Sequence, residues 1–386
     1  MIVKKYGGAT LADPQKIKSV AQKVAKQHFS GVKIVVVVSA MGQTTNNLIQ
    51  LAHQVSDRPA LRELDMLLTA GERISMSLLS IALNDLGCPA ISFTGSQAGI
   101  LTDDSHINAQ IVEVRAQRVQ QALAENKVVI LAGFQGMSRH TKEITTLGRG
   151  GSDITAVAIS SFLKADRCEI LKDVAGVYSA DPKLVENAQL QTELSYDHLH
   201  EMTSWGAKVL HQQSVEMAAN NNVTLLVGAA ADDQPAAGTI ITTNYKTPAQ
   251  KILAINSFEK IMEIEWSKNF HDLNNFFNEN QIGQCTLLHI EGGQRYFITA
   301  PNETLQSISY FSKHQDTYQI ISEDISTVSV THSLEISDQT LNDLQNNLNK
   351  NNIEVIVSFN TQYSSHFFVH QKQRSEAIRI LHSLIS

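Results

Sequence analysis

The chain opens with Met1-Ile-Val-Lys-Lys-Tyr-Gly-Gly-Ala-Thr10. Its first six residues predict a strand from Met1 to Tyr6. The two glycines that follow allow backbone N–H groups to approach an anion closely, and a helix after them would add its positive N-terminal end. Lys5 beside such a turn can neutralise a phosphate. A plain tight turn with a solvated lysine explains the same residues equally well, so this stretch alone leaves an anion site open.

Short β-rich runs and helical segments alternate from the first residue to about residue 240. This alternation is typical of an α/β fold, with helices on both faces of a mostly parallel central sheet. Helical spacing of apolar residues predicts helices over Pro14–His28, Ile107–Glu125 and Thr155–Leu163. The expected strands are Met1–Tyr6, Val32–Ser39, Ala90–Thr94, Val128–Gly133, Cys168–Lys172 and Val223–Val227.

The composition changes near Thr243–Lys251, where we expect a domain boundary, because glycine becomes rare beyond it and polar amides become frequent. One βαββαβ unit is predicted next. Its strands are Ile261–Trp266, Cys285–Glu291, Arg295–Ala300 and Tyr318–Ser322, and its helices are Asp272–Gln281 and Glu303–Lys313. A second copy then begins and stops before its sixth strand. Its strands are Ser326–Thr331, Ile353–Phe359 and His366–His370, and its helices are Asp338–Lys350 and Ser375–Leu384.

The composition excludes several classes of protein. The chain has 386 residues, which predicts two or three domains. Lys and Arg number 31 against 38 Asp and Glu, so the net charge of −7 gives no support to a nucleic-acid-binding protein. The longest aliphatic run, Ile34–Val38, is too short to span a bilayer, and the first residues do not resemble a signal peptide. We expect a cytoplasmic protein whose three cysteines, Cys88, Cys168 and Cys285, are reduced and bind no metal.

Two motifs place small polar residues after predicted strands or at helix starts. Val38–Asn46 includes Ser39, Gly42 and Thr45, and a helix N-cap would explain only one of its hydroxyls. Thr69–Arg73 places Glu72 at a predicted helix start, where a simple capping acid is the more ordinary interpretation.

The most informative motif is Thr145–Asp153, which contains three glycines, Arg149, Ser152 and Asp153 just before a predicted helix. An arginine can bind a carboxylate with two parallel hydrogen bonds, and the glycines allow close backbone approach. This concentration indicates anion binding. Two further stretches, Lys172–Lys183 and Gly206–His211, are unremarkable alone.

Taken together and in this order, these motifs closely resemble those of the aspartate kinases, members of the amino acid kinase family. The resemblance covers residues 1 to about 241. It implies a three-layer amino acid kinase domain over residues 1–245, followed by ACT-like units over 255–323 and 324–386, of which the second is degenerate. The implied reaction is transfer of the ATP γ-phosphoryl group to the β-carboxylate of L-aspartate, which gives 4-phospho-L-aspartate for lysine and threonine biosynthesis.

The resemblance also assigns roles by position. Lys5 would hold the phosphoryl group, Lys208 would contact the nucleotide phosphates, and Asp153 would organise these lysines. The substrate-binding positions are Ser39, Thr45, Glu72, Arg149 and Ser152, with Arg149 on the α-carboxylate and Glu72 on the amino group. The nucleotide-binding positions are Gly7, Gly8, Lys172, Asp173, Tyr178, Lys183 and Lys208. Mg²⁺ is expected with ATP, with few direct protein ligands.

This chain departs from the family pattern at several nucleotide-site positions, notably Ala9, Lys172, Ala175 and Gln212, so we expect altered nucleotide affinity. In the second ACT-like unit, Ser329–Ser333 lacks the glycine that the family's effector loop usually has. Since lysine or threonine binds at that loop in the family, we expect feedback inhibition by these amino acids to be weak or absent and this region chiefly to form a homodimer.

Three alternatives stay open. The chain could be a catalytically weak pseudokinase partner, although every charged position of the implied active site is retained. It could be a kinase for another small acid, such as glutamate or a carbamate, although Arg149 with Glu72 favours an α-amino acid. It could also be an amino acid sensing module.

Overall fold

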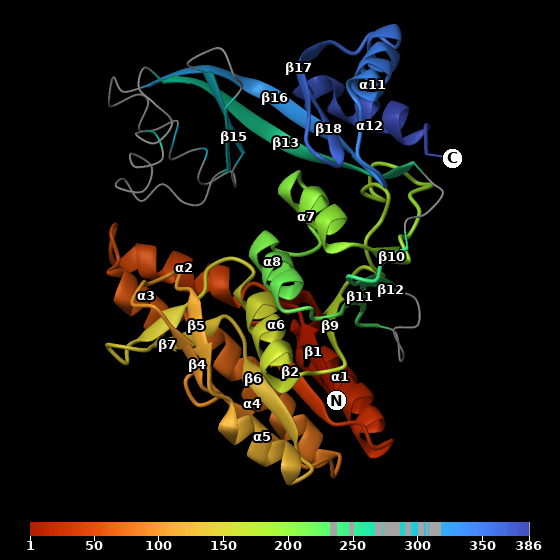
Figure 1. Ribbon diagram of the computed structural model, residues 1–386. Helices are drawn as coiled ribbons and strands as arrows, with labels where there is room; N and C mark the ends of the chain where they lie inside the picture. Colours follow the sequence, from red (N-terminus) through yellow and green to blue (C-terminus); the bar gives the residue numbers. More distant parts are fainter. Residues whose placement is uncertain are drawn as a thin grey trace. The chain divides into compact units, whose positions relative to one another are not determined.

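The computed structural model describes residues 1–231, 238–246, 251–266, 286–289, 295–299 and 318–385, together with Leu273, Leu305 and Ile308. Contacts within the chain divide it into two units. The N-terminal unit consists of Met1–Val177, Leu190–Thr203 and Lys208–Lys246, and the C-terminal unit of Tyr178–Gln189, Ser204–Ala207 and Thr247–Ser386. Each unit is described by itself below, with the element labels of Figure 1.

The N-terminal unit is built on an eight-stranded sheet in the order β10-β12-β11-β9-β1-β2-β6-β3. The six strands from β11 to β3 are all parallel, and only β12 runs antiparallel to β11. The strands are β1 (Ile2–Tyr6), β2 (Ile34–Val38), β3 (Ala90–Phe93), β6 (Val128–Ala132), β9 (Arg167–Lys172), β10 (Glu193–Leu194), β11 (Leu225–Ala229) and β12 (Gly238–Ile241). The predicted strands are thus confirmed within two residues at each end.

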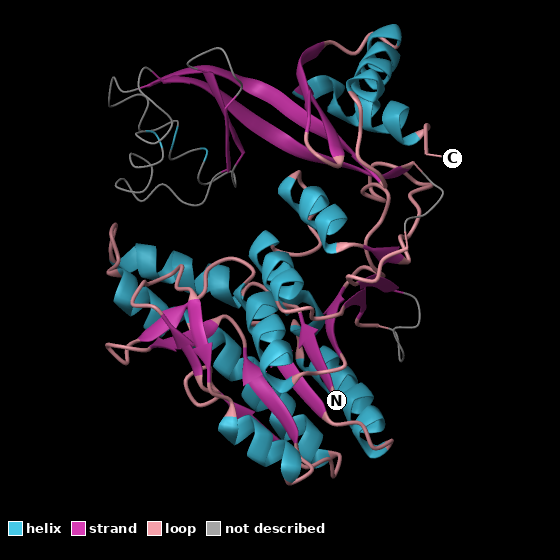
Figure 2. Cartoon of the chain, in the orientation of Figure 1, coloured by secondary structure: helices cyan, strands magenta, loops and turns pink. Residues whose placement is uncertain are grey.

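Helices cover both faces of this sheet (Figure 2). On one face, α1 (Pro14–Phe29) and α4 (Ala70–Asp85) pack on the alternate residues Ile34, Val36 and Val38 of β2. On the other face, α6 (Gly151–Leu163) contacts β1, β2 and β9, and α8 (Gln212–Asn220) packs on α6. Because β2 is buried on both faces, it is a continuous aliphatic run rather than an alternating one. This is the predicted three-layer α/β architecture.

A second, four-stranded sheet was not predicted from the sequence. It has the order β5-β4-β7-β8, and α2 (Thr44–Val55), α3 (Leu61–Leu68) and the short η1 (Gly8–Leu11) belong to the same unit. Its strands are β4 (Ile100–Thr102), β5 (Ile111–Val114), β7 (Gln135–Ser138) and β8 (Ile144–Thr146).

The predicted helix Ile107–Glu125 is wrong in its first half. Residues Ile111–Val114 form strand β5, which pairs with β4, and only α5 (Gln117–Ala124) is helical. Three of these four strand residues are β-branched, so pairing with a neighbouring strand overrides the helical spacing. The helix predicted over Thr155–Leu163 begins earlier, at Gly151, so Ser152 and Asp153 lie in its first turn.

One helical stretch, Leu61–Asp85, is long and apolar enough to cross a membrane by length and composition alone. It consists of α3 and α4, and Leu79 and Leu83 of α4 are fully buried in the core of the N-terminal unit. A core helix passes the same test, so this stretch is weak evidence for a membrane span.

The C-terminal unit contains an antiparallel six-stranded sheet in the order β14-β15-β13-β16-β18-β17. Its two central strands, β13 (Ile252–Trp266) and β16 (Tyr318–His332), pair along nearly their whole length, as Figure 2 shows. The other elements are β14 (Thr286–His289), β15 (Arg295–Thr299), α11 (Asp338–Lys350), β17 (Val355–Asn360), β18 (Ser364–His370), η2 (Gln371–Gln373) and α12 (Arg374–His382). The helix α7 (Tyr196–Ser204) belongs to the N-terminal unit except for its last residue.

The predicted break between strands Tyr318–Ser322 and Ser326–Thr331 is wrong, because both belong to β16. Its pairing with β13 continues through shifts of register instead of ending. The predicted helix Asp338–Lys350 is confirmed. The predicted helices Asp272–Gln281 and Glu303–Lys313 lie outside the described residues apart from Leu273, Leu305 and Ile308. The division of this unit into two ACT-like units stays a prediction, with which the sheet is consistent.

The C-terminal sheet buries two histidines. His366 of β18 has no exposed surface, and its ring stacks on Trp205 with 3.7 Å between the centroids. Its Nδ1 lies 2.9 Å from Oγ of Ser329. Burial lowers the pKa of His332 to about 4 and, with a contribution from His332, that of His366 to about 3.

These histidines are expected to make the C-terminal unit sensitive to acid. Because both folded-state pKa values lie below the ordinary value of 6.5, folding favours the neutral rings. This contribution to stability is complete above pH 6.5 and is lost as the pH falls toward 4 and 3, by about 1.4 kcal/mol per histidine per pH unit. Both tryptophans of the chain lie in this unit, so urea unfolding followed by fluorescence reports it. Burial also lowers the pKa of His382 in the same unit, so His366→Phe should reduce the slope against pH by the share of one histidine, about 1.4 kcal/mol per pH unit, and an unchanged slope would contradict the assignment.

Candidate active site

The site lies where four neighbouring parallel strands end. Strands β9, β1, β2 and β6 are adjacent in the sheet, and their carboxyl ends meet at one edge, where α/β folds usually bind ligands. Beyond β1 come Gly7 and Gly8, beyond β2 come Ser39 and Ala40, and β9 ends at Lys172, the first residue of the stretch Lys172–Lys183. Three of the sequence motifs therefore converge because the strands that carry them are neighbours.

The centre of this edge is an ion pair between Lys5 of β1 and Asp153 of α6, with 2.7 Å between Nζ and Oδ1. Both side chains are less than 10% exposed. Burial by itself raises the pKa of a carboxyl group, but Lys5 and then Lys172 outweigh it and hold the pKa of Asp153 below its ordinary value. The Asp153 carboxylate is therefore charged at neutral pH and joins two lysines from adjacent strands.

Lys172 and His211 complete the charged cluster around Asp153. The Nζ of Lys172 donates a hydrogen bond to the carbonyl of Val209, which holds the loop before α8. Burial lowers the pKa of Lys172, and Asp153 partly offsets this effect. Burial also lowers the pKa of His211. The Nδ1 of His211 is buried and has no hydrogen-bond partner among the described residues.

Glu72 lies in the first turn of α4 and is 3% exposed. Its Oε1 accepts a hydrogen bond of 3.0 Å from the backbone N–H of Ala40. The other oxygen, Oε2, is buried without a hydrogen-bond partner in the described part of the chain. Burial raises the pKa of Glu72 to about 7, although the Ala40 N–H and Lys5 act in the opposite direction. A cationic ligand group at Oε2 would satisfy this acceptor.

Close backbone approach explains two of the motif glycines. A Cβ atom on Gly8 would lie 2.7 Å from the carbonyl oxygen of Ala40, so a side chain there would push the turn after β1 away from β2. Gly150 caps α6 with a φ of +72°, and a Cβ there would lie 2.2 Å from Cβ of His211. These glycines let the loops pack closely around the Lys5–Asp153 pair.

The other predicted residues of the N-terminal unit lie on loops or at helix starts. Ser152 is almost buried against Gly133, and Ser39 and Thr45 are half-buried after β2 and in the first turn of α2. Arg149 is exposed and lies close enough to His211 to lower its pKa. Asp173 and Lys208 are also exposed.

Two predicted nucleotide residues belong to the other unit. Tyr178 and Lys183 lie in the segment Tyr178–Gln189, which the contacts assign to the C-terminal unit. Their place in a nucleotide site therefore stays a prediction.

Sequence reasoning missed the site's buried Asp65 and treated His211 as an ordinary interior residue. Asp65 stands in an amphipathic helix pattern, where an acid ordinarily faces solvent, so only its depth in the fold distinguishes it. Among the described residues, no group of three or more His, Cys, Asp or Glu side chains could hold a metal ion.

The family model described as "amino acid kinase family" matches residues 1–229. The chain is 49% identical to an aspartokinase of Mycobacterium tuberculosis over 246 residues, which are 64% of this chain and 58% of the relative. It is 50% identical to an aspartokinase of Corynebacterium glutamicum over 241 residues, 62% of this chain and 57% of the relative. The chain thus spans less than two thirds of the length of these curated relatives.

Two solved structures resemble the whole chain. The structure of E. coli aspartokinase III in complex with aspartate and ADP has a TM-score of 0.80 at 20% identity, and the match covers 100% of this chain and 99% of that one. The aspartate kinase of Synechocystis has a TM-score of 0.57 at 30% identity, with 99% and 69% covered. Because the family model spans more than half of the chain and the fold agrees, the chain belongs to the amino acid kinase family.

Proposed function

We propose that the chain is an aspartate kinase, which transfers the γ-phosphoryl group of ATP to the β-carboxylate of L-aspartate and forms 4-phospho-L-aspartate. The observation that carries this proposal is the buried Lys5–Asp153 pair at the carboxyl edge of the sheet, with Lys172 beside it. Phosphoryl transfer depends mainly on positioning and on positive charge near the transferring oxygens. A lysine held by a charged carboxylate stays in one place, so it can stabilise the charge that develops on the phosphoryl group.

The amino acid would bind between Arg149 and Glu72. The exposed guanidinium of Arg149 would bind the α-carboxylate through two hydrogen bonds. The Oε2 of Glu72, which has no hydrogen-bond partner within the described ranges, would accept a hydrogen bond from the α-ammonium group. Ser39, Thr45 and Ser152 would donate to the remaining substrate oxygens. The β-carboxylate would then face Lys5.

The nucleotide would bind with its phosphates over Gly7, Gly8, Lys172 and Lys208, since two glycines after a strand and two lysines suit an anion. Asp173, Tyr178 and Lys183 would contribute to the rest of the nucleotide site. Mg²⁺ bound to ATP would neutralise part of the phosphate charge. We also propose a cytoplasmic homodimer formed through the ACT-like region, a role in lysine and threonine biosynthesis, and no nucleic-acid or membrane partner.

Two other functions are less well supported. A pseudokinase would not need the charged set around Asp153, and a kinase for an acid without an α-amino group would not need the buried Glu72 acceptor.

A hydroxamate assay with L-aspartate and Mg-ATP tests the proposal directly, because hydroxylamine traps an acyl phosphate. We expect aspartate-dependent hydroxamate formation by the full chain. Hydroxamate formation with glutamate but none with aspartate would replace the proposal with that of another carboxylate kinase, and none with either would support the pseudokinase.

The pH dependence of the reaction is expected to report Glu72. Its pKa of about 7 is raised from 4.5, so the carboxylate is half protonated near neutral pH and fully charged only above it. Because the charged form binds the ammonium group, kcat/KM for aspartate should rise about tenfold from pH 6 to pH 8. In Glu72→Gln this limb of the profile should disappear, and its persistence would contradict the role given to Glu72.

A further inference from the structure

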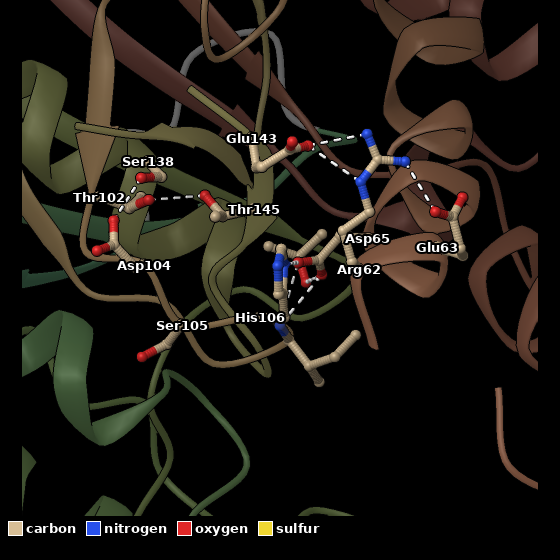
Figure 3. Close-up of polar contacts among 12 residues, drawn as sticks. Arg62, Glu63, Asp65, Thr102, Asp104, Ser105, His106, Ser138, Glu143 and Thr145 are labelled. Atoms are coloured by element: carbon tan, nitrogen blue, oxygen red, sulfur yellow. Dashed lines mark hydrogen bonds and ion pairs between the residues drawn. The ribbon is translucent and has the colours of Figure 1, made fainter. Parts of the chain in front are cut away.

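Asp65 of α3 is fully buried and receives hydrogen bonds from two separate segments of the chain. The hydroxyl of Thr146 donates to Oδ1 over 2.6 Å, and the backbone N–H of Ile107 donates to the same oxygen over 3.1 Å. The Nδ1 of His106 lies 2.6 Å from Oδ2 (Figure 3). A carboxylate with no exposed surface is costly unless it is paired and hydrogen-bonded in this way.

The segment that contains His106 and Ile107 is a strained loop. Ile107 has a φ of +70°, a conformation that a β-branched residue adopts only when its surroundings enforce it. The hydrogen bond from its N–H to Asp65 is part of that enforcement. A Cβ on Gly148, whose own φ is +71°, would lie 3.1 Å from the carbonyl oxygen of Ile107. The strained loop therefore packs directly on the backbone just before Arg149.

The other segment, which contains Thr146, leads to Arg149 itself. Thr146 is the last residue of β8, and its carbonyl accepts a hydrogen bond of 2.9 Å from the N–H of Ala109. Asp65 is thus hydrogen-bonded to the 106–108 loop and to the end of β8, the two stretches of backbone that hold the start of the Gly148–Gly151 turn. An altered contact at Asp65 would move Arg149 without touching it.

The helix that carries Asp65 runs directly into the helix that carries Glu72. Thr69 is both the C-cap of α3 and the N-cap of α4, and its N–H closes the last turn of α3 with a hydrogen bond of 3.1 Å to the backbone carbonyl of Asp65. The carbonyl of Thr69 in turn accepts one from the Gln135 side chain over 3.2 Å. The Asp65 side chain therefore joins the backbone before Arg149 to α3, and α4 with Glu72 follows α3 without a break.

We propose that Asp65 is a positioning residue which, through Thr146 and the 106–108 loop, sets the separation between Glu72 and Arg149 and so the fit of the amino acid's carboxylate and ammonium groups. This inference rests on the proposed function, because it takes those two residues as the contacts of the substrate. It assigns no contact with substrate or nucleotide to Asp65 itself.

Adjacent threonines of β8 supply a matched pair of variants. Thr145 and Thr146 are both fully buried, but the hydroxyl of Thr145 lies 2.7 Å from that of Thr102 and not at Asp65 (Figure 3). Thr146→Val should raise KM for aspartate about tenfold, change kcat less than threefold and leave KM for ATP within twofold, because loss of a hydrogen bond to a charged group affects the placement of Arg149. Thr145→Val should leave both KM values within about twofold.

Thr146→Ser keeps the donor hydroxyl and should restore KM for aspartate to within about twofold of the original value. Asp65→Asn should have the same selective effect as Thr146→Val, and if it fails to fold the threonine series still decides. The proposal is overturned if Thr145→Val and Thr146→Val raise KM for aspartate equally, or if Thr146→Val changes KM for ATP as much. If the unaltered chain forms no hydroxamate, the proposed function has failed, which is a different result from a working kinase whose KM values do not separate.

Discussion

Replacing Lys5 with methionine is expected to lower kcat about 10³-fold, or about 4 kcal/mol in the activation free energy. Lys5 lies at the end of β1 with its ammonium group 2.7 Å from Asp153, so the protein has already oriented this charge before substrate binds. Methionine fills a similar volume without the charge. The loss should therefore appear in kcat of the hydroxamate assay more than in either KM. The substitution also removes one partner of a buried ion pair, which lowers stability, although Lys172 still acts on the Asp153 carboxylate, so unfolding of the variant is measured beside kcat.

Lys4 provides the matched control. It precedes Lys5 on β1 and also forms a buried ion pair, with 2.7 Å between its Nζ and Oε2 of Glu169. Removing one partner of such a pair costs about 3–5 kcal/mol of stability, whereas replacing both by apolar residues is often neutral. The double variant Lys4→Met with Glu169→Leu should therefore fold and keep kcat within about threefold.

The comparison separates catalysis from stability. If Lys5→Met keeps kcat within tenfold of the unaltered enzyme, Lys5 is not the cation that stabilises the transferring phosphoryl group. If the double variant at Lys4 and Glu169 loses as much activity as Lys5→Met while it remains folded, the effect belongs to the strand and not to the site.

The architecture of the N-terminal unit could be predicted because the local sequence pattern of its elements agrees with their burial and their ends in the fold. The run Ile34–Val38 is buried on both faces, and helix α1 starts where Asp13 accepts a hydrogen bond from the N–H of Lys16 and Pro14 follows. The small sheet was missed because its strands are only three or four residues long. Strands this short are stable only when they are paired, as β5 is with β4, and the residue pattern of a single strand does not reveal that pairing.

The grouping of residues around Asp153 could be predicted from the sequence, but their pKa shifts and hydrogen-bond partners could not. Glycines and small hydroxyl residues after apolar runs indicated a site, and the parallel sheet brings Lys5 and Asp153 together as that hypothesis required. The raised pKa of Glu72 and the unpartnered Nδ1 of His211 depend on burial, which no local pattern reveals. Asp65 was missed for the same reason, since its partners Ile107 and Thr146 lie 42 and 81 residues away.

Replacing Arg149 with methionine is expected to raise KM for aspartate about 10²-fold, because two charge-assisted hydrogen bonds to the α-carboxylate are lost, worth about 3 kcal/mol together. Arg149→Lys keeps the charge without the planar pair of donors and should raise KM about tenfold. Arg149 is exposed, so both variants should fold normally. The exposed Arg139, whose guanidinium lies 3.9 Å from Glu113, is the control, and Arg139→Met should leave KM unchanged.

A substrate lacking the α-carboxylate makes this test specific. β-Alanine has the acceptor carboxylate and the amino group of aspartate but not the group assigned to Arg149. If Arg149 binds that group, the unaltered enzyme should use β-alanine about 10²-fold less efficiently, and Arg149→Met should cause no further loss with it. If Arg149→Met lowers kcat/KM for β-alanine as much as for aspartate, the guanidinium acts on the nucleotide or on the fold, and the assignment of the α-carboxylate to it is wrong.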